Sequence, residues 1–284
     1  MGPSSNQQND YFAKAIEAAR RPSDMLIFIL TLAALLAIFI LVAVLSNPII
    51  IWIVLGLLAL SLLLVRLDQT WFINNAVKLD GSPYTYIDDV IREVSANLGV
   101  SNVSVFTIRD TKEPIMVIGH FNRYGVVFDA EFMEVLDQDE ARAIIAREIA
   151  QIKYKSAELN AFIIPLSEKL KLLGLGAFIK FTFGFWSRRA EETSNRLALL
   201  YVRDPHLLIK ALIKSKIGKQ FTELFDENIL LAQGQNQHTI LQKLSEVLNS
   251  ESSLLAQTKE ILEYAHEQGI ASPPAQDTQT SPVQ

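Results

Sequence analysis

Two long runs without charged residues dominate the hydrophobic pattern near the N-terminus. Residues 25–46 and residues 48–65 contain no Asp, Glu, Lys or Arg. A helix needs about 20 apolar residues to cross the hydrocarbon core of a bilayer. The Asn47-Pro48 pair between the two runs favours a tight turn. The pattern therefore predicts a transmembrane helical hairpin over residues 23–67, in preference to two core helices of a soluble protein or a cleaved signal peptide.

The charges beside these runs predict their orientation. Basic residues lie on both outer flanks: Lys14, Arg20 and Arg21 before the first run, and Arg66 and Lys78 after the second. Because positively charged flanks stay on the cytoplasmic side, both termini and the main domain are expected in the cytoplasm. The chain has no cysteine, which fits a reducing compartment. We expect a multi-pass protein of the inner (cytoplasmic) membrane or an equivalent membrane, with residues 1–22 as a cytoplasmic N-terminal segment.

After the second run the pattern becomes that of a folded domain, expected over residues 68–267. Apolar residues recur at helical spacing up to Leu98, and residues 103–108 then alternate with a period of two. Two short apolar runs complete a small predicted sheet, and further helical patterns follow: 115–118 and 124–128 for the sheet, then 137–155, 187–202, 204–212, 239–248 and 254–265 for the helices. The fold class is therefore predicted as α+β, mostly helical, and residues 268–284 are expected to form a disordered tail.

The stretch from residue 161 to residue 185 is strongly apolar but contains charged side chains. These are Glu168, Lys169, Lys171 and Lys180. It is either a hairpin on or in the bilayer, or a pair of packed helices of the main domain. Charged groups at the middle of a membrane are costly, so a position at the surface is favoured over a crossing.

A helix is predicted to begin at Asp137, because a good N-cap residue is followed three positions later by Glu140. Its centre reads Arg147-Glu148-Ile149-Ala150-Gln151. A zinc peptidase has His-Glu-x-x-His in this frame, since histidines at i and i+4 share a helix face and the glutamate acts as general base. Here Arg147 and Gln151 replace the histidines, and Arg147 adds a permanent positive charge.

Residues 81–214 resemble the HtpX-type family of membrane zinc metallopeptidases, which are gluzincins. The order of elements is similar, and the segment from Ser187-Arg188 through Glu191 to Asn195 is similar to the family's S-R-x-x-E-x-x-x-D helix. The resemblance implies a zincin-like domain. It also implies that Glu148 is at the general-base position, that Arg147, Gln151 and Glu191 are at vestigial ligand positions, and that Asn195 replaces a supporting aspartate.

The sequence contains no motif that indicates another kind of catalytic or binding site. None of the four histidines, His120, His206, His238 and His266, has a second ligand at i+3 or i+4. No phosphate-binding glycine loop or serine nucleophile motif is present, and a formal charge of -5 without a basic cluster beyond the membrane flank argues against nucleic acid. No metal or other cofactor is expected.

Two classes of function follow from the resemblance and its missing ligands. The first is a membrane-anchored, catalytically inactive pseudopeptidase that binds or scaffolds a membrane protein partner, or a protease of protein quality control. The alternative is an active membrane metalloendopeptidase with a divergent metal site and bound zinc. The bilayer is a partner under both interpretations.

Two structural hypotheses accompany the first class. Tyr124, Val126 and Phe128 are expected to form an edge strand to which an extended partner segment adds, unless the tail or residues 161–185 cover that edge. Arg147 is expected to replace the zinc ion by a bidentate pair with Glu191. The plain alternative is that Glu148 and Glu191 are ordinary carboxylates on helix faces.

Overall fold

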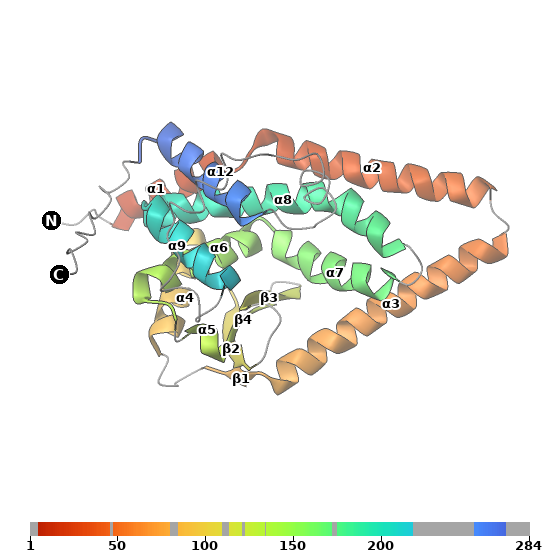
Figure 1. The fold of residues 1–284 in the computed structure, drawn as a ribbon, viewed down its shortest axis with the longest axis horizontal. Helices are drawn as coiled ribbons and strands as arrows, with labels where there is room; N and C mark the ends of the chain where they lie inside the picture. Colours follow the sequence, from red (N-terminus) through yellow and green to blue (C-terminus); the bar gives the residue numbers. More distant parts are fainter. Residues whose placement is uncertain are drawn as a thin grey trace, which may run out of the picture.

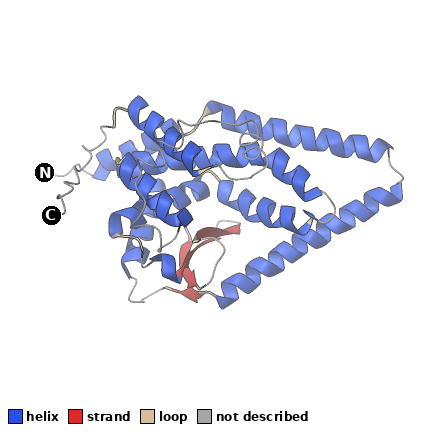
Figure 2. Cartoon of the chain, viewed as in Figure 1, coloured by secondary structure: helices blue, strands red, loops and turns tan. Residues whose placement is uncertain are grey.

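The computed structural model describes residues 5–45, 48–79, 85–109, 114–120, 123–133, 135–171, 175–217 and 253–270. Helices make up most of it, and one four-stranded sheet lies at one side, so the predicted α+β class is confirmed (Figure 2). In chain order the elements are α1 (Ser5–Ala19), α2 (Pro22–Leu45), α3 (Pro48–Asn75), β1 (Val77–Lys78), α4 (Thr85–Leu98), β2 (Val103–Ile108), β3 (Ile115–His120), β4 (Arg123–Asp129), α5 (Ala130–Met133), α6 (Gln138–Lys153), α7 (Ser156–Lys169), α8 (Leu175–Val202), α9 (Pro205–Ile217) and α12 (Leu254–Glu267).

The two long apolar helices α2 and α3 extend away from the rest of the molecule and approach each other at their far ends (Figure 1). Their large apolar side chains are exposed, as Leu30 and Trp52 illustrate at 59% and 74%. By length and composition, one stretch of the described residues, Ile51–Asn75, is able to cross a membrane, and a shorter apolar stretch, Ser23–Ala34, lies in α2. A transmembrane hairpin of both helices stays a prediction.

The apolar stretch that begins at residue 161 lies between these two helices. Helix α7 packs against α3, and α8 packs against α2 (Figure 1). Phe181 and Phe185 of α8 are exposed, at 55% and 52%. Residues 161–169 and 175–185 therefore belong to helices that pack on those of the predicted hairpin.

The sheet has the strand order β1-β2-β4-β3. Strand β2 runs parallel to β4, whereas β3 is antiparallel to β4 and β1 is antiparallel to β2. The prediction of an edge at Tyr124, Val126 and Phe128 is wrong, because β4 is paired on both sides. The physical reason is visible in its burial: residues 124–128 are buried on both faces, as the continuous apolar run of an interior strand requires. The edge strand beside β4 is β3.

Helix α6 lies at the centre of the main domain and packs against α4, α7, α8 and α9. Its predicted start is confirmed by a complete capping box. The backbone N–H of Glu140 donates to Asp137 Oδ1 (2.8 Å), and the backbone N–H of Asp137 donates to Glu140 Oε2 (2.9 Å). The buried apolar side chains of α6 then run from Ala141 to Ile152. This well-fixed helix positions the candidate site.

Helices at both ends of the chain also pack on the main domain. Phe12, Ala15 and Ala19 of α1 belong to the hydrophobic core, and the Tyr11 hydroxyl donates to the Leu200 carbonyl (2.6 Å). The predicted helix at 254–265 is confirmed by α12. The helix predicted at 239–248 and residues 271–284 of the predicted tail lie outside the described residues.

Candidate functional site

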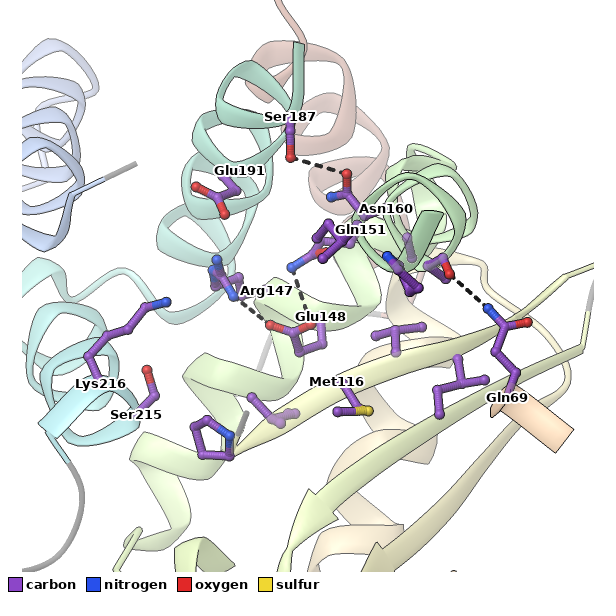
Figure 3. A pocket seen from close by; sticks show the side chains of 18 of the residues that line it. Gln69, Met116, Arg147, Glu148, Gln151, Asn160, Ser187, Glu191, Ser215 and Lys216 are labelled. Atoms are coloured by element: carbon purple, nitrogen blue, oxygen red, sulfur yellow. Dashed lines mark hydrogen bonds and ion pairs between the residues drawn. The ribbon is translucent and has the colours of Figure 1, made fainter. Parts of the chain in front are cut away.

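The centre of α6 carries a bonded group of three polar side chains. Arg147 Nη1 lies 2.6 Å from Glu148 Oε1, and Gln151 Nε2 donates to Glu148 Oε2 over 3.1 Å (Figure 3). The side chains of Arg147 and Glu148 are 13% and 4% exposed. Each oxygen of the Glu148 carboxylate is therefore held by a side chain of the same helix.

Helix α8 brings two more of the predicted residues to this place. Glu191 and Asn195 are four residues apart, so they share a helix face, and both are buried. Arg147 Nε donates to Asn195 Oδ1 (2.9 Å), and Asn195 Nδ2 donates to Gln257 Oε1 of α12 (3.5 Å). A chain of polar contacts thus connects α6, α8 and α12 through the Arg147 side chain.

The structure therefore brings together the five residues that were predicted at catalytic, ligand and supporting positions. Arg147, Glu148, Gln151 and Glu191 line one cavity, and Asn195 holds Arg147 from α8. Figure 3 shows Glu191 on α8, opposite Arg147. The guanidinium contacts described above go to Glu148 and Asn195, and the predicted bidentate pair of Arg147 with Glu191 stays a prediction.

The cavity has a volume of about 450 Å³ and is walled by α3, α6, α7, α8, α9 and β3. Along β3 and the residue before it, five consecutive residues, 114–118, line it. Side chains of a strand alternate between its two faces, so an unbroken run of lining residues means that the strand lies edge-on to the cavity. Among the described strands none pairs with this side of β3. The backbone edge that the sequence placed on β4 therefore lies on β3, beside Arg147 and Glu148.

Polar side chains that sequence reasoning missed complete the walls. Ser187 Oγ donates to Asn160 Oδ1 (3.1 Å), and Gln69 Nε2 donates to the Ala161 carbonyl (2.8 Å). Ser215 and Lys216 at the end of α9 line the cavity as well. Asn160 precedes the apolar stretch that begins at residue 161, and no motif around it indicated a role in the site.

Tyr124 has a structural role in place of the predicted one. It is buried in β4, and its hydroxyl bonds to Glu158 Oε1 of α7 at 2.5 Å. Burial first, and then the hydrogen bond and the negative charge of Glu158, raise the pKa of Tyr124 to about 12. The neutral phenol therefore connects the sheet to α7 over the whole physiological pH range.

The side chains at the site do not fit a zinc ion. A catalytic zinc takes three nitrogen, oxygen or sulfur ligands from the protein. Here Arg147 and Gln151 present a guanidinium and an amide, and the carboxylate of Glu148 is bonded to Arg147 Nη1. Within the ranges that the structure describes, no group of three His, Cys, Asp or Glu side chains gathers where it can hold a metal ion.

Comparisons of the chain with protein-family models, with curated proteins and with solved structures found no match. The functional interpretation therefore rests on the geometry of the cavity and on the residues of this chain.

Proposed function

We propose that the chain is a membrane-anchored pseudopeptidase of the HtpX type, which binds protein partners in the cavity between α6, α8 and β3 without cleaving them. One observation carries this proposal. The Arg147 guanidinium, at the position where the resemblance implies a metal ligand, is bonded to Glu148 and Asn195, and a cavity and the edge of β3 lie beside it. A site of this kind retains the means of binding an extended chain and lacks the ligands of the hydrolytic metal.

The exposed apolar surface of α2 and α3 supports the membrane anchor. In the most apolar window of the Ile51–Asn75 stretch, 12% of the residues are buried, whereas a core helix of a soluble protein is mostly buried. Transfer of such side chains from water to lipid is favourable by about 25 cal/mol per Å² of apolar surface. The bilayer is therefore the environment that these helices fit.

Contacts at the end of the second apolar run support a position of α7 near the membrane surface. Lys169 Nζ lies 2.6 Å from Asp68 Oδ2, and the Arg66 guanidinium lies 4.2 Å from the centre of the Phe162 ring. Arg66 is the basic residue that ends the second predicted span. The charge of Lys169 is thereby paired near the predicted cytoplasmic boundary and not at mid-membrane.

The open edge of β3 supports recognition of an extended segment. Unpaired backbone donors and acceptors of an edge strand bind a further strand from a partner, and side pockets give specificity. The cavity supplies both the strand edge and side chains for specificity. The backbone of β3 borders it, and the polar side chains of Asn160 and Ser187 line it. A partner strand in this place would lie next to Arg147.

Site-specific photocrosslinking from Met116 of β3 in intact membranes tests the binding site. The matched control is the same photoreactive residue at Gln138, which is exposed at the start of α6 and does not line the cavity. We expect a discrete membrane-protein adduct from Met116 and none from Gln138, with the partner identified by mass spectrometry. Adducts from Met116 to segments of the same chain alone, or equal adducts from both positions, would exclude partner binding at this edge.

Metal analysis of the purified full-length protein separates the pseudopeptidase from the active enzyme. We expect no stoichiometric zinc and no cleavage of casein, since the donor set lacks two ligands. Near-equimolar zinc, together with a proteolytic activity that the Glu148→Gln variant loses, would establish the active metalloendopeptidase instead.

A further inference from the structure

A second cavity, of about 430 Å³, lies on the other side of α8 from the candidate site. It is enclosed by the beginning of α2, the junction between α6 and α7, and the middle of α8. Arg20 and Asp24, at the start of the first predicted span, are among its lining residues. The cavity therefore lies at the level where the predicted membrane surface begins.

Basic side chains outnumber acidic ones in the lining of this cavity. Arg20, Lys155 and Arg189 line it, and Asp24 is the one carboxylate among the described lining residues. Asp24 Oδ2 accepts hydrogen bonds from Thr193 Oγ1 (2.8 Å) and from the backbone N–H of Arg21 (3.3 Å), and its other carboxylate oxygen, Oδ1, is buried without a hydrogen-bond partner among the described residues. Positive charge therefore exceeds negative charge within the cavity.

The three cations differ in how far they are already engaged. Arg189 Nη1 lies 3.3 Å from Glu192 Oε2, and Arg189 Nη2 lies 3.5 Å from Ser23 Oγ. Arg20 and Lys155 have exposed side chains without an ion-pair partner in the described part of the chain. Lys153 also lines the cavity, but its ammonium group lies against Gly99. Two cations at least are thus available to an anion.

The lining of the cavity also contains apolar and aromatic side chains. Met25, Phe28, Leu159 and Trp186 line it, and the rings of Phe28 and Trp186 contact each other with centroids 5.6 Å apart. Met25 is 61% exposed and continues into the exposed apolar surface of α2. Tryptophan is enriched at the level of lipid headgroups, where an apolar body meets a polar layer. The cavity lining therefore combines cations with apolar side chains of α2.

We propose that this cavity binds an anionic phospholipid, with the phosphate among Arg20, Lys155 and Arg189 and an acyl chain over Met25 and Phe28. The inference rests on the proposed membrane anchorage, since it requires a bilayer at the start of α2. Basic pockets between membrane helices on the cytoplasmic side select anionic headgroups. A free phosphate shares the headgroup chemistry, but it leaves the apolar wall uncovered.

Lipid retention by the full-length protein in neutral detergent micelles, followed by native mass spectrometry, tests this site. The probes are phosphatidylglycerol, phosphatidylcholine of equal chain length, and glycerol 3-phosphate. The test variant is Arg20→Gln with Lys155→Gln. The matched control is Arg109→Gln with Lys259→Gln, which removes the same charge from side chains that are 75% and 70% exposed outside the cavity.

We expect the wild type and the control variant to retain phosphatidylglycerol in preference to phosphatidylcholine. Loss of two cations near an anionic headgroup weakens binding by about 30-fold, so the test variant is expected to lose most of its phosphatidylglycerol. Equal retention of the two lipids by the wild type, or an equal loss in both variants, would overturn the proposal. Displacement of the lipid by an equal concentration of glycerol 3-phosphate would overturn it as well, in favour of a phosphate site.

Alkaline carbonate extraction of native membranes tests the membrane anchor independently of the lipid site. Protein that is extracted, yet prefers phosphatidylglycerol in micelles, would contradict the membrane hairpin and support the anionic site. Protein that stays in the membrane without such a preference would support the anchor and overturn the lipid site.

Discussion

Replacement of Arg147 by methionine tests whether its guanidinium holds the centre of the site together. Methionine keeps much of the apolar stem and removes the charge. In the wild type, Arg147 Nη1 lies 2.6 Å from Glu148 Oε1 and Arg147 Nε donates to Asn195 Oδ1, with side chains of Arg147 and Glu148 13% and 4% exposed. The variant leaves a buried carboxylate at Glu148 with the Gln151 amide but without its cation. Because both charged side chains are largely buried, we expect a large loss of stability.

Breaking a buried ion pair by removal of one partner costs about 3 to 5 kcal/mol, because the remaining charge stays desolvated. For a domain of this size, 1 kcal/mol shifts the melting temperature by about 2 to 4 °C, so a decrease of about 6 to 20 °C is expected. The double change Arg147→Met with Glu148→Gln should recover much of this decrease. It removes both charges, and well-packed neutral replacements of buried ion pairs are often neutral in stability.

Thermal unfolding of the full-length protein in detergent micelles, followed by circular dichroism, measures these shifts. The control is Arg142→Met on the same helix, whose side chain is 37% exposed and lies 3.2 Å from Asp139 and 3.4 Å from Glu93. Exposed pairs of this kind contribute about 0 to 1 kcal/mol. Equal melting temperatures for the Arg147→Met and Arg142→Met variants would refute the reasoning, as would a double variant no more stable than Arg147→Met alone.

Three further predictions concern topology, metal affinity and pH. Since the chain has no native cysteine, a single cysteine at Asn47 should react with impermeant maleimide from the side opposite to a C-terminal reporter; reaction from the same side would exclude the hairpin. Arg147→His with Gln151→His should create zinc affinity measurable by calorimetry, and Glu191→Ala in that background should abolish it if Glu191 is the third ligand. Burial would raise the pKa of Glu140, but hydrogen bonds from Lys214, the Asp137 backbone and Lys210 outweigh it and lower the pKa. The stabilisation by Glu140 is therefore complete above its unfolded pKa of about 4.3 and is lost as the pH falls through the lower folded pKa. Urea unfolding between pH 6 and pH 3 should accordingly show a steeper loss of stability in the wild type than in Glu140→Gln, and parallel profiles would contradict this assignment.

Several features of the protein were fixed by local sequence. The start of α6 follows from Asp137 and Glu140, because a capping box is made by residues three positions apart. The position of Gln151 beside both Arg147 and Glu148 follows from helical spacing, since it lies four residues after the first and three after the second. The long uncharged runs likewise determined two long helices with exposed apolar side chains, since apolar content over about 20 residues is a local property.

Other features depended on how distant segments pack, and the sequence did not determine them. The apolar run of β4 is equally compatible with an edge strand and an interior strand, and only its pairing with both β2 and β3 decided the matter. The hydrogen bond between Arg147 and Asn195 likewise depended on packing between distant segments. A long flexible side chain reaches several acceptors, and the placement of Asn195 on α8 fixed the guanidinium where Glu148 is within 2.6 Å.

The second cavity shows this dependence most clearly. Arg20, Lys155 and Arg189 lie far apart in the sequence and carry no common motif. They meet because α2, the α6–α7 junction and α8 pack against one another at the start of the apolar helices. Spacing along a chain reports on one helix or strand at a time, whereas a site shared by three elements exists only once their packing brings its residues together.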